Sequence, residues 1–262
     1  MRLDLLLLGL SAGLAAGPFV LAKDTPPFSH RDWDSVLQQF VNEAGLVDYE
    51  GLARERSVFE RYIRSIEATS PESHPGTFPG RNDGLAYYLN AYNAQVFKGV
   101  LARGPEDRSV WRGLISGYGF FVRMSIEIGG RRTNLKALED KVIRAQFRDP
   151  RVHAALNCAS LGCPRLPRHS FEPSRLEEQL DAVMREFVIT PRHCRLDDAT
   201  QTVTLSRIFD WFSKDFLAYE RERGNSEPSL IDYINRYRPP GAQVPRTYSM
   251  RFSSYDKGIN KQ

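Results

Sequence analysis

The chain has 262 residues, of which 41% are hydrophobic and 26% are charged, and its formal net charge is +4. This length is ample for a globular domain with a real core. The basic residues are spread along the sequence and form no concentrated stripe, so we expect no nucleic-acid binding.

The first residues have the layout of a removable secretory signal. Met1 and Arg2 give a weakly basic start, and a mostly apolar run follows over residues 3–16. Small or short residues ending at Ala22 predict cleavage there. The run is shorter than the ~20 residues of a membrane-spanning helix. We therefore expect residues 1–22 to be a signal peptide, and the mature protein to be periplasmic or secreted without a membrane span.

The predicted elements mix helices with strand pairs. In the first half of the chain we expect a helix capped by Ser29 over 29–42, a short extended piece at 46–49, and helices over 51–68 and 84–102. A strand at 120–128, a Gly129-Gly130 hairpin turn and a return strand at 131–135 should follow, then a helix capped by Asn134 over 134–146 and a strand at 151–157. The remaining predicted elements are a helix over 172–187, a hairpin at 195–205, a helix capped by Ser206 over 207–217, a helix over 226–236 and a last strand at 248–253. No regular β-α-β alternation and no long linker is visible. The sequence therefore predicts a single α+β domain over residues 28–260, with a long central helix packed on a small mixed or antiparallel sheet.

Two amides lie within the apolar face of the long helix. At helical spacing, Asn90 and Asn93 share that face with Leu89 and Phe97. An unpaired buried amide would cost about 1–3 kcal/mol, so both side chains must form hydrogen bonds. They either tie the helix to the backbone of a neighbouring loop or line a polar pocket and orient a catalytic group.

The segment 151–164 carries the residues best suited to chemistry. His153 titrates close to neutral pH, and Cys158 is a nucleophile if its pKa is lowered. Residues five apart lie on opposite faces of a strand and about 140° apart on a helix. A hydrogen bond between His153 and Cys158 therefore requires a turn or bulge near Asn157, whereas His153 and Asn157, four apart, share a face in either structure.

The cysteine count leaves several pairings open. Cys158, Cys163 and Cys194 are an odd number for an oxidising compartment. A Cys158–Cys163 disulfide would close a tight loop, with Gly162 supplying flexibility. A Cys163–Cys194 disulfide would instead leave Cys158 free for chemistry.

Metal and cofactor sites are not expected. His153, His193 and the cysteines lack the tight spacing of zinc sites, so we predict no metal. The sequence contains no Walker loop, no Gly-x-Gly-x-x-Gly and no Gly-x-Ser-x-Gly, and no cofactor is predicted. His30, His74 and His169 lie in loop or terminal contexts, where they are expected to face solvent.

Five motifs, in this order, give the chain its family resemblance: residues 47–49 (Val-Asp-Tyr), 87–93 (Tyr-Tyr-Leu-Asn-Ala-Tyr-Asn), 152–164 around Asn-Cys-Ala-Ser, 205–216, and 255–260 (Tyr-Asp-Lys-Gly-Ile-Asn). With them the chain resembles the domain-of-unknown-function family 547. Lys257 departs from the Trp common in the family, and Cys194 does not belong to the pattern. The resemblance implies an exported bacterial protein, and the family's occasional joining to glutaredoxin-like modules implies thiol chemistry. The order of elements is also similar to papain-like and transglutaminase-like folds, an analogy at the level of fold alone.

These observations lead to one hypothesis and two alternatives. The hypothesis is a thiol-dependent hydrolase or acyl-transferase in which Cys158 attacks, His153 moves the proton, and Asn90 or Asn93 orients the imidazole or stabilises an oxyanion. Its binding residues would be Tyr92, Asn157, Ser160, Cys163 and Asp256. The first alternative is a non-catalytic binding or accessory domain with a structural Cys158–Cys163 disulfide. The second is thiol–disulfide exchange by the same pair. The partner would be a small molecule or peptide, and the sequence sets no oligomeric state.

Overall fold

The computed structural model of the protein describes residues 27–104, 109–111 and 119–262. The predicted signal over residues 1–22 lies outside these residues. Over the described residues the chain is α+β, as predicted, with helices and two separate small sheets. No helix in this part of the chain has both the length and the hydropathy to cross a bilayer.

The long central helix is confirmed. It is α4 (Arg81–Arg103), and almost every residue from Gly84 to Leu101 is buried, as expected for a helix enclosed on all sides. Gly104, at φ 101°, ends it in a conformation that suits glycine. Around α4 lie α1 (Arg31–Phe40), α2 (Tyr49–Arg54), α3 (Ser57–Ala68) and the short 3₁₀ turn η1 (Pro75–Thr77). The predicted helix over 51–68 is thus divided in two, and His30, not Ser29, is the N-cap of α1.

The segment after the long helix differs from its prediction in its first half. Residues 119–123 form the helix α5 (Gly119–Arg123), which buries Phe120 and Phe121, and only β1 (Ser125–Ile128) is a strand. The Gly129-Gly130 turn is confirmed, with both glycines at positive φ, and β2 (Arg131–Asn134) pairs antiparallel with β1. Asn134 caps the next helix as predicted, because its side chain accepts a hydrogen bond from the Ala137 N–H. That helix runs through α6 (Leu135–Ala137), the π-helix η2 (Leu138–Arg144) and α7 (Ala145–Phe147).

The predicted strand over 151–157 is wrong. Residues 152–155 form the helix α8 (Val152–Ala155), which follows a turn at Pro150 and Arg151. Asp149 accepts the Arg151 N–H at 3.0 Å and so supports the first turn. All four residues of α8 are buried, so no periodicity distinguished helix from strand. The loop that carries the cysteines follows, and then η3 (Pro173–Arg175) and α9 (Leu176–Ile189).

The C-terminal part holds the three-stranded sheet. The hairpin of β3 (Cys194–Asp197) and β4 (Thr202–Leu205) is confirmed, and β5 (Ser249–Phe252) pairs parallel with β4, which makes a mixed sheet. Ser206 caps α10 (Arg207–Trp211) as predicted, but the helix breaks at Phe212 and continues as α11 (Ser213–Glu222). The predicted helix over 226–236 begins later, as α12 (Leu230–Asn235), with Ser229 as its N-cap.

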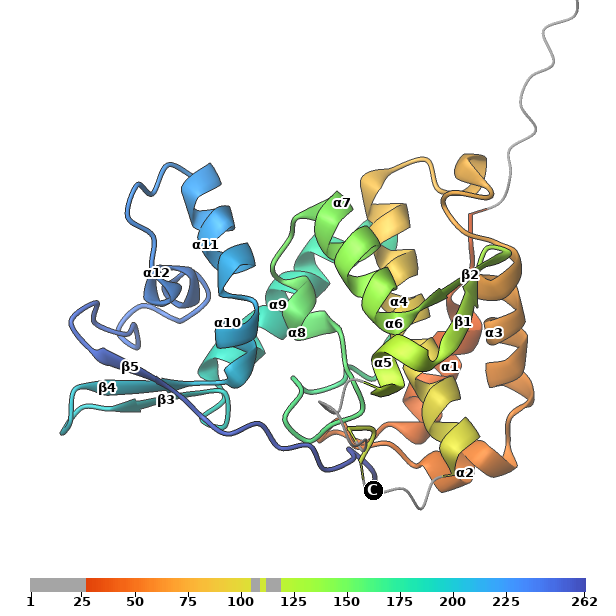
Figure 1. Cartoon of the computed structure of the whole chain (residues 1–262), viewed down its shortest axis with the longest axis horizontal. Coiled ribbons are helices and arrows are strands. Elements are labelled where there is room, and N and C mark those ends of the chain that lie inside the picture. The colour runs from red at the N-terminus through yellow and green to blue at the C-terminus, as the bar shows by residue number, and fades with distance from the viewer. Residues whose placement is uncertain (1–26, 105–108, 112–118) are drawn as a thin grey trace, which may run out of the picture.

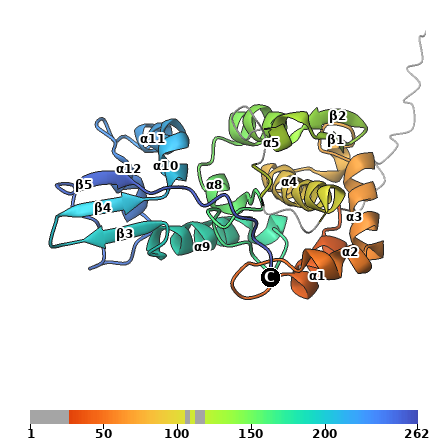
Figure 2. The same ribbon diagram turned by 60° about the horizontal axis from the view of Figure 1, so that its bottom comes forward.

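Two hydrophobic clusters organise these elements. One surrounds α4, and the other fills the space between the three-stranded sheet, α10–α12 and the end of α9. Figures 1 and 2 both show α9 running between the two parts, with the sheet away from the long helix. The neighbours of α4 are therefore mainly helices. The segment after β5 crosses back from the sheet to the helical part, where the chain ends.

Candidate functional site

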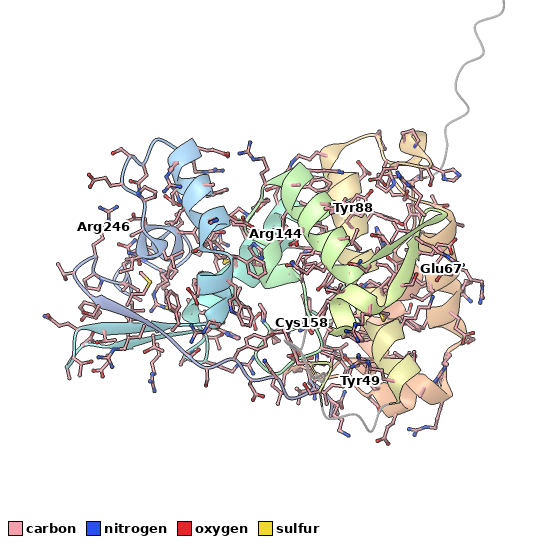
Figure 3. The ribbon with its side chains drawn as sticks, in the orientation of Figure 1. Tyr49, Glu67, Tyr88, Arg144, Cys158 and Arg246 are labelled. Atoms are coloured by element: carbon pink, nitrogen blue, oxygen red, sulfur yellow. The ribbon has the colours of Figure 1, made fainter. Side chains whose placement is uncertain are left out.

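A pocket of about 300 Å³ lies where the two parts of the protein meet. Its aromatic lining is Tyr92, Trp111, Phe121, Trp211, Phe212 and Tyr255. Its polar and ionisable lining is Lys136, Glu139, Arg144, His153, Cys158 and Cys163. Figure 3 shows Cys158 on the loop between the two parts, and Arg144 on the side of its helix that faces α10 and α11.

The backbone before Cys158 is held by the long helix. Asn93 of α4 donates to the Ala155 carbonyl at 3.0 Å and accepts the Asn157 N–H at 2.9 Å. Asn157 in turn accepts the Ala159 N–H at 2.9 Å and donates to the Pro164 carbonyl at 3.0 Å. Ala159 has φ 59°, a left-handed conformation that is uncommon for a residue with a side chain. These bonds fix the sharp turn that presents Cys158 to the pocket.

The sulfurs of Cys158 and Cys163 are in contact. Both cysteines are free, and their Sγ atoms lie 2.7 Å apart, so a small approach would reach the bond length of about 2.05 Å in a disulfide. The Tyr255 hydroxyl lies 3.0 Å from Cys158 Sγ and 3.1 Å from Cys163 Sγ. Both cysteines line the pocket, where Cys158 is partly exposed and Cys163 is buried.

The surroundings of the pair favour a thiolate on Cys163. Burial would raise the pKa of Cys163, but hydrogen bonds from Cys158, from Tyr255 and from the Cys158 backbone N–H outweigh it and lower this pKa. Burial, and then the neighbouring Cys163, raise the pKa of Cys158. Burial and the charge of the sulfurs also raise the pKa of Tyr255, so its hydroxyl stays protonated and donates a hydrogen bond to sulfur. The two thiols therefore behave as one coupled unit that shares a proton.

Gly162 has a different role from the flexibility we expected. A Cβ at this position would lie 2.8 Å from the Tyr255 ring and from the Asp256 carbonyl oxygen. That carbonyl accepts the Gly162 N–H at 2.9 Å, and Leu161 donates to the Gly258 carbonyl at 2.7 Å. The missing side chain thus lets the C-terminal segment lie against the cysteine loop, which brings Tyr255 to the sulfurs.

His153 is held by Asp215, a residue of α11. Its Nε2 atom lies 2.8 Å from Asp215 Oδ2, and its ring stacks on Phe212 with the centroids 3.9 Å apart. Burial lowers the pKa of His153, and the hydrogen bond to Asp215 only partly opposes it, so the imidazole is neutral near neutral pH. Burial would raise the pKa of Asp215, but hydrogen bonds from His153 and Arg144 outweigh it and hold that pKa well below its usual range. The hydrogen bonds of the described residues do not join His153 to Cys158, although both line the pocket.

The π-helix explains how two further ionisable residues reach the pocket. Glu139 and Arg144 are five apart, which would place them about 140° apart on an α-helix. The i→i+5 bonding of η2 brings residues five apart onto nearly the same face, and both line the pocket. Arg144 forms ion pairs with Asp215 at 2.7 Å and with Asp140 at 2.6 Å. Burial, and then the nearby Asp140, raise the pKa of Glu139 to about 7.

The residues expected to be catalytic take different places. Cys158 and His153 line one pocket, whereas Asn90 and Asn93 are not among its lining residues. Asn90 donates to the Phe171 carbonyl at 2.8 Å and accepts the Phe171 N–H at 2.9 Å. Both side chains thus form hydrogen bonds with the backbone of neighbouring segments, which is the first of the two alternatives that their pattern allowed.

The residues expected to bind also divide. Tyr92 and Cys163 line the pocket. Asn157 supports the turn, and Ser160 accepts the Trp111 indole N–H at 2.6 Å with its hydroxyl 3.6 Å from Cys158 Sγ. Asp256 is exposed, and its carboxylate accepts the Gly258 N–H at 2.9 Å.

Two expectations about other side chains are wrong. His30 does not face solvent: it is only 8% exposed, and its Nδ1 atom lies 2.9 Å from the Tyr62 hydroxyl. Asn157 does not share a face with His153, because α8 ends between them and the side chains go to different partners. Cys194 lies on β3 with its Sγ 3.6 Å from Arg238 Nη1, while Cys163 contacts Cys158.

Sequence reasoning did not name several pocket residues as functional. Trp211 and Phe212 belong to the motif at 205–216, as does Asp215, which bonds His153 without lining the pocket, and Tyr255 begins the motif at 255–260, so the motifs carried the signal. Glu139 and Arg144 belong to no such motif, and only the π-helix places them together. Within the described parts of the chain, no group of three or more His, Cys, Asp or Glu side chains could hold a metal ion.

The fold and this site define a class: an α+β protein with a paired-thiol pocket between a helical part and a small sheet. Residues 77–188 match the model of the family described as Protein of unknown function, DUF547. That segment is therefore a DUF547 segment, which confirms the family resemblance over α4, η2, α8 and the cysteine loop. The comparison with curated proteins and the comparison with solved structures gave no match.

Proposed function

We propose that the protein carries out thiol–disulfide exchange through Cys158 and Cys163. The supporting observation is the contact of the two sulfurs at 2.7 Å, with Cys158 partly exposed and Cys163 buried. An accessible attacking thiol and a protected resolving thiol are what exchange through a mixed disulfide requires.

The proposed reaction begins from the state with a thiolate on Cys163 and a thiol on Cys158, and the Cys158 proton passes to the Cys163 thiolate across the short contact. The Cys158 thiolate attacks one sulfur of a substrate disulfide R–S–S–R′, which forms a mixed disulfide with R and releases R′S⁻. Cys163 then loses its proton to R′S⁻ and attacks the Cys158 sulfur, which closes the protein disulfide and releases RS⁻, protonated from water. The protein dithiol is oxidised and the substrate disulfide is reduced to two thiols. A dithiol donor reverses these steps and restores the protein.

A trapping experiment tests this proposal. In Cys163→Ser, glutathione disulfide should leave a stable mixed disulfide on Cys158, because the resolving thiol is missing. In the unchanged protein it should instead produce the Cys158–Cys163 disulfide, and Cys194→Ser is the matched control. Mass spectrometry of the digested protein locates each bond. A Cys163→Ser variant that forms no mixed disulfide, or a bridge that a mild dithiol cannot reopen, contradicts exchange and supports the non-catalytic alternative.

Acyl transfer is the second candidate, favoured by one observation. Asp215 lies 2.8 Å from the His153 ring and fixes its orientation, and His153 lines the same pocket as Cys158, as in a Cys-His-Asp arrangement. This mechanism requires His153 to approach Cys158. Hydrolysis of a thioester should then be lost in Cys158→Ser and His153→Asn but retained in Cys163→Ser. Exchange shows the opposite dependence on Cys163, so the same variants separate the two functions.

We also propose that the protein is exported, from the signal-like residues 1–22. In an oxidising compartment the Cys158–Cys163 pair would rest as a disulfide and accept electrons from substrate thiols. N-terminal sequencing of protein recovered outside the cytoplasm tests this: a chain that retains Met1 contradicts cleavage.

A further inference from the structure

The Glu139 carboxylate lines the pocket, and the two cations of its own helix that also line it, Lys136 and Arg144, are paired with other acids. Lys136 is paired with Asp140 at 2.5 Å, and Arg144 is paired with both Asp140 and Asp215. Asp140 and Asp215 thus neutralise the charges of Lys136 and Arg144, and neither of these two cations is paired with Glu139. Among the described residues Glu139 takes part in no ion pair, and its hydrogen bond comes from the Tyr92 hydroxyl at 3.5 Å.

Tyr92 connects this carboxylate to the thiol pair. Burial, then Glu139, and then Cys158 and Cys163 raise the pKa of Tyr92, so its hydroxyl stays protonated close to all three groups. The pKa of about 7 for Glu139 means that a cation entering the pocket would draw its proton away and be held by a full negative charge. The ionisable groups that act on this carboxyl are Lys136, Asp140 and Arg144 of its own helix and Tyr92 of α4.

The aromatic walls suit the same ligand. The rings of Trp111, Trp211 and Tyr255 lie 4.9–6.1 Å apart, and Trp211 is 40% exposed at the pocket. Ring faces of tryptophan and tyrosine attract cations. The Lys257 ammonium already lies 5.3 Å from the Trp111 ring, and Arg144 lies 4.8 Å from the Phe212 ring. The pocket thus combines an unpaired carboxylate with rings of the type that bind ammonium groups.

We propose that the pocket selects disulfides that carry an ammonium group, with the ammonium at Glu139 and the disulfide at Cys158. This substrate class rests on the proposed exchange reaction, because it concerns the same pocket. The Cys158 thiolate forms a bond to one substrate sulfur, and the other sulfur leaves as a thiolate. Glu139 binds the substrate and takes no part in the electron transfer.

Three disulfides of similar size but different charge test the selectivity. Cystamine is cationic, bis(2-hydroxyethyl) disulfide is neutral, and 3,3′-dithiodipropionate is anionic. The rate of mixed-disulfide formation is measured on Cys163→Ser and on Cys163→Ser/Glu139→Gln, at a pH near 8 where Glu139 is ionised. For each disulfide, the rate with Cys163→Ser is divided by the rate with Cys163→Ser/Glu139→Gln, which cancels the intrinsic reactivity of that disulfide. We expect a ratio of about tenfold for cystamine, close to one for the neutral disulfide and below one for the anion.

The controls separate the possible failures. Glu139→Asp should retain part of the cystamine preference, and Glu50→Gln, an exposed acid on α2, should leave all three rates unchanged. Equal ratios for the three disulfides overturn the selectivity and leave exchange intact. If no disulfide reacts, the proposed exchange reaction is contradicted. The binding of phenethylammonium to the Cys158→Ser/Cys163→Ser protein then tests separately whether the pocket binds a cation. Quenching of tryptophan fluorescence by phenethylammonium, but not by 2-phenylethanol, supports the site, and equal responses overturn it.

Discussion

Replacing Asn93 by alanine should both destabilise the protein and alter Cys158. The side chain is 2% exposed and satisfies two backbone groups, the Ala155 carbonyl and the Asn157 N–H. Without it both groups stay buried and unpaired, at about 1–3 kcal/mol each, so we expect a loss of about 2–6 kcal/mol in the free energy of unfolding. The same change releases the turn that presents Cys158.

Asn90→Ala is the matched comparison. Asn90 lies one turn earlier on α4, is fully buried, and bonds the carbonyl and N–H of Phe171 in the same two-bond pattern. Asn90→Ala should likewise lower the free energy of unfolding by about 2–6 kcal/mol, because it also leaves two buried backbone groups unpaired. Phe171 lies outside the cysteine turn, however, so the alkylation rate of Cys158 should stay within about twofold.

Urea denaturation gives the free energies, and iodoacetamide labelling read by mass spectrometry gives the rate at Cys158. We expect both variants to be destabilised and only Asn93→Ala to change the rate severalfold. A loss below about 1 kcal/mol in Asn93→Ala would show that its two bonds do not hold the turn. Equal changes in the labelling rate of both variants would refute the local role of Asn93.

Three further perturbations test other parts of the structure. Gly162→Ala should cost about 1–3 kcal/mol of stability, because its Cβ would lie 2.8 Å from the C-terminal segment. The same change should raise the pKa of the Cys163 thiol, because Tyr255 is pushed away and its hydrogen bond to the sulfur is lost. Ultraviolet absorbance of the thiolate measures that pKa, and Gly76→Ala, with no atom within 4 Å of its Cβ, should change neither property. Arg151→Met should cost about 1.5–3 kcal/mol, because buried Asp149 loses the guanidinium 2.6 Å away and keeps only the backbone N–H of residue 151 at 3.0 Å and Arg81 at 4.0 Å. Thermal denaturation of Arg151→Met, Asp149→Asn and the double variant should give a double loss smaller than the sum, and simple additivity contradicts this. Burial lowers the pKa of His30 to about 3, against about 6.5 in an unfolded chain, so below pH 6.5 the unfolded state binds a proton that the folded state does not. Stability should therefore fall from pH 7 to pH 5, and in His30→Gln the slope of urea-derived free energy should be shallower by up to about 1.4 kcal/mol per pH unit; an unchanged slope would contradict this.

Local signals in the sequence predicted much of the fold. The long helix, the Gly129-Gly130 hairpin, the Asn134 and Ser206 caps, the 195–205 hairpin and the last strand each depend on turn chemistry or periodicity within a few residues, and each is confirmed. The errors fall at 119–123, a run of five residues that buries only Phe120 and Phe121, and at 152–155, where all four residues are buried, so neither run is long enough or patterned enough to show a period. In such runs the hydrophobic pattern is the same for a strand and a helix.

The site divides in the same way. The sequence by itself determined where the candidate residues of the cysteine loop lie, and that Asn90 and Asn93 need hydrogen-bond partners, because these follow from residue type and local spacing. Only the tertiary structure decided their partners. It places Asp215 beside His153 and Tyr255 over the two sulfurs, although 62 and 97 residues separate them along the chain from His153 and Cys158. It also turns Glu139 and Arg144 to one face through the i→i+5 bonds of a π-helix. Contacts between distant segments depend on how the two hydrophobic clusters pack, and no local pattern in the sequence contains that information.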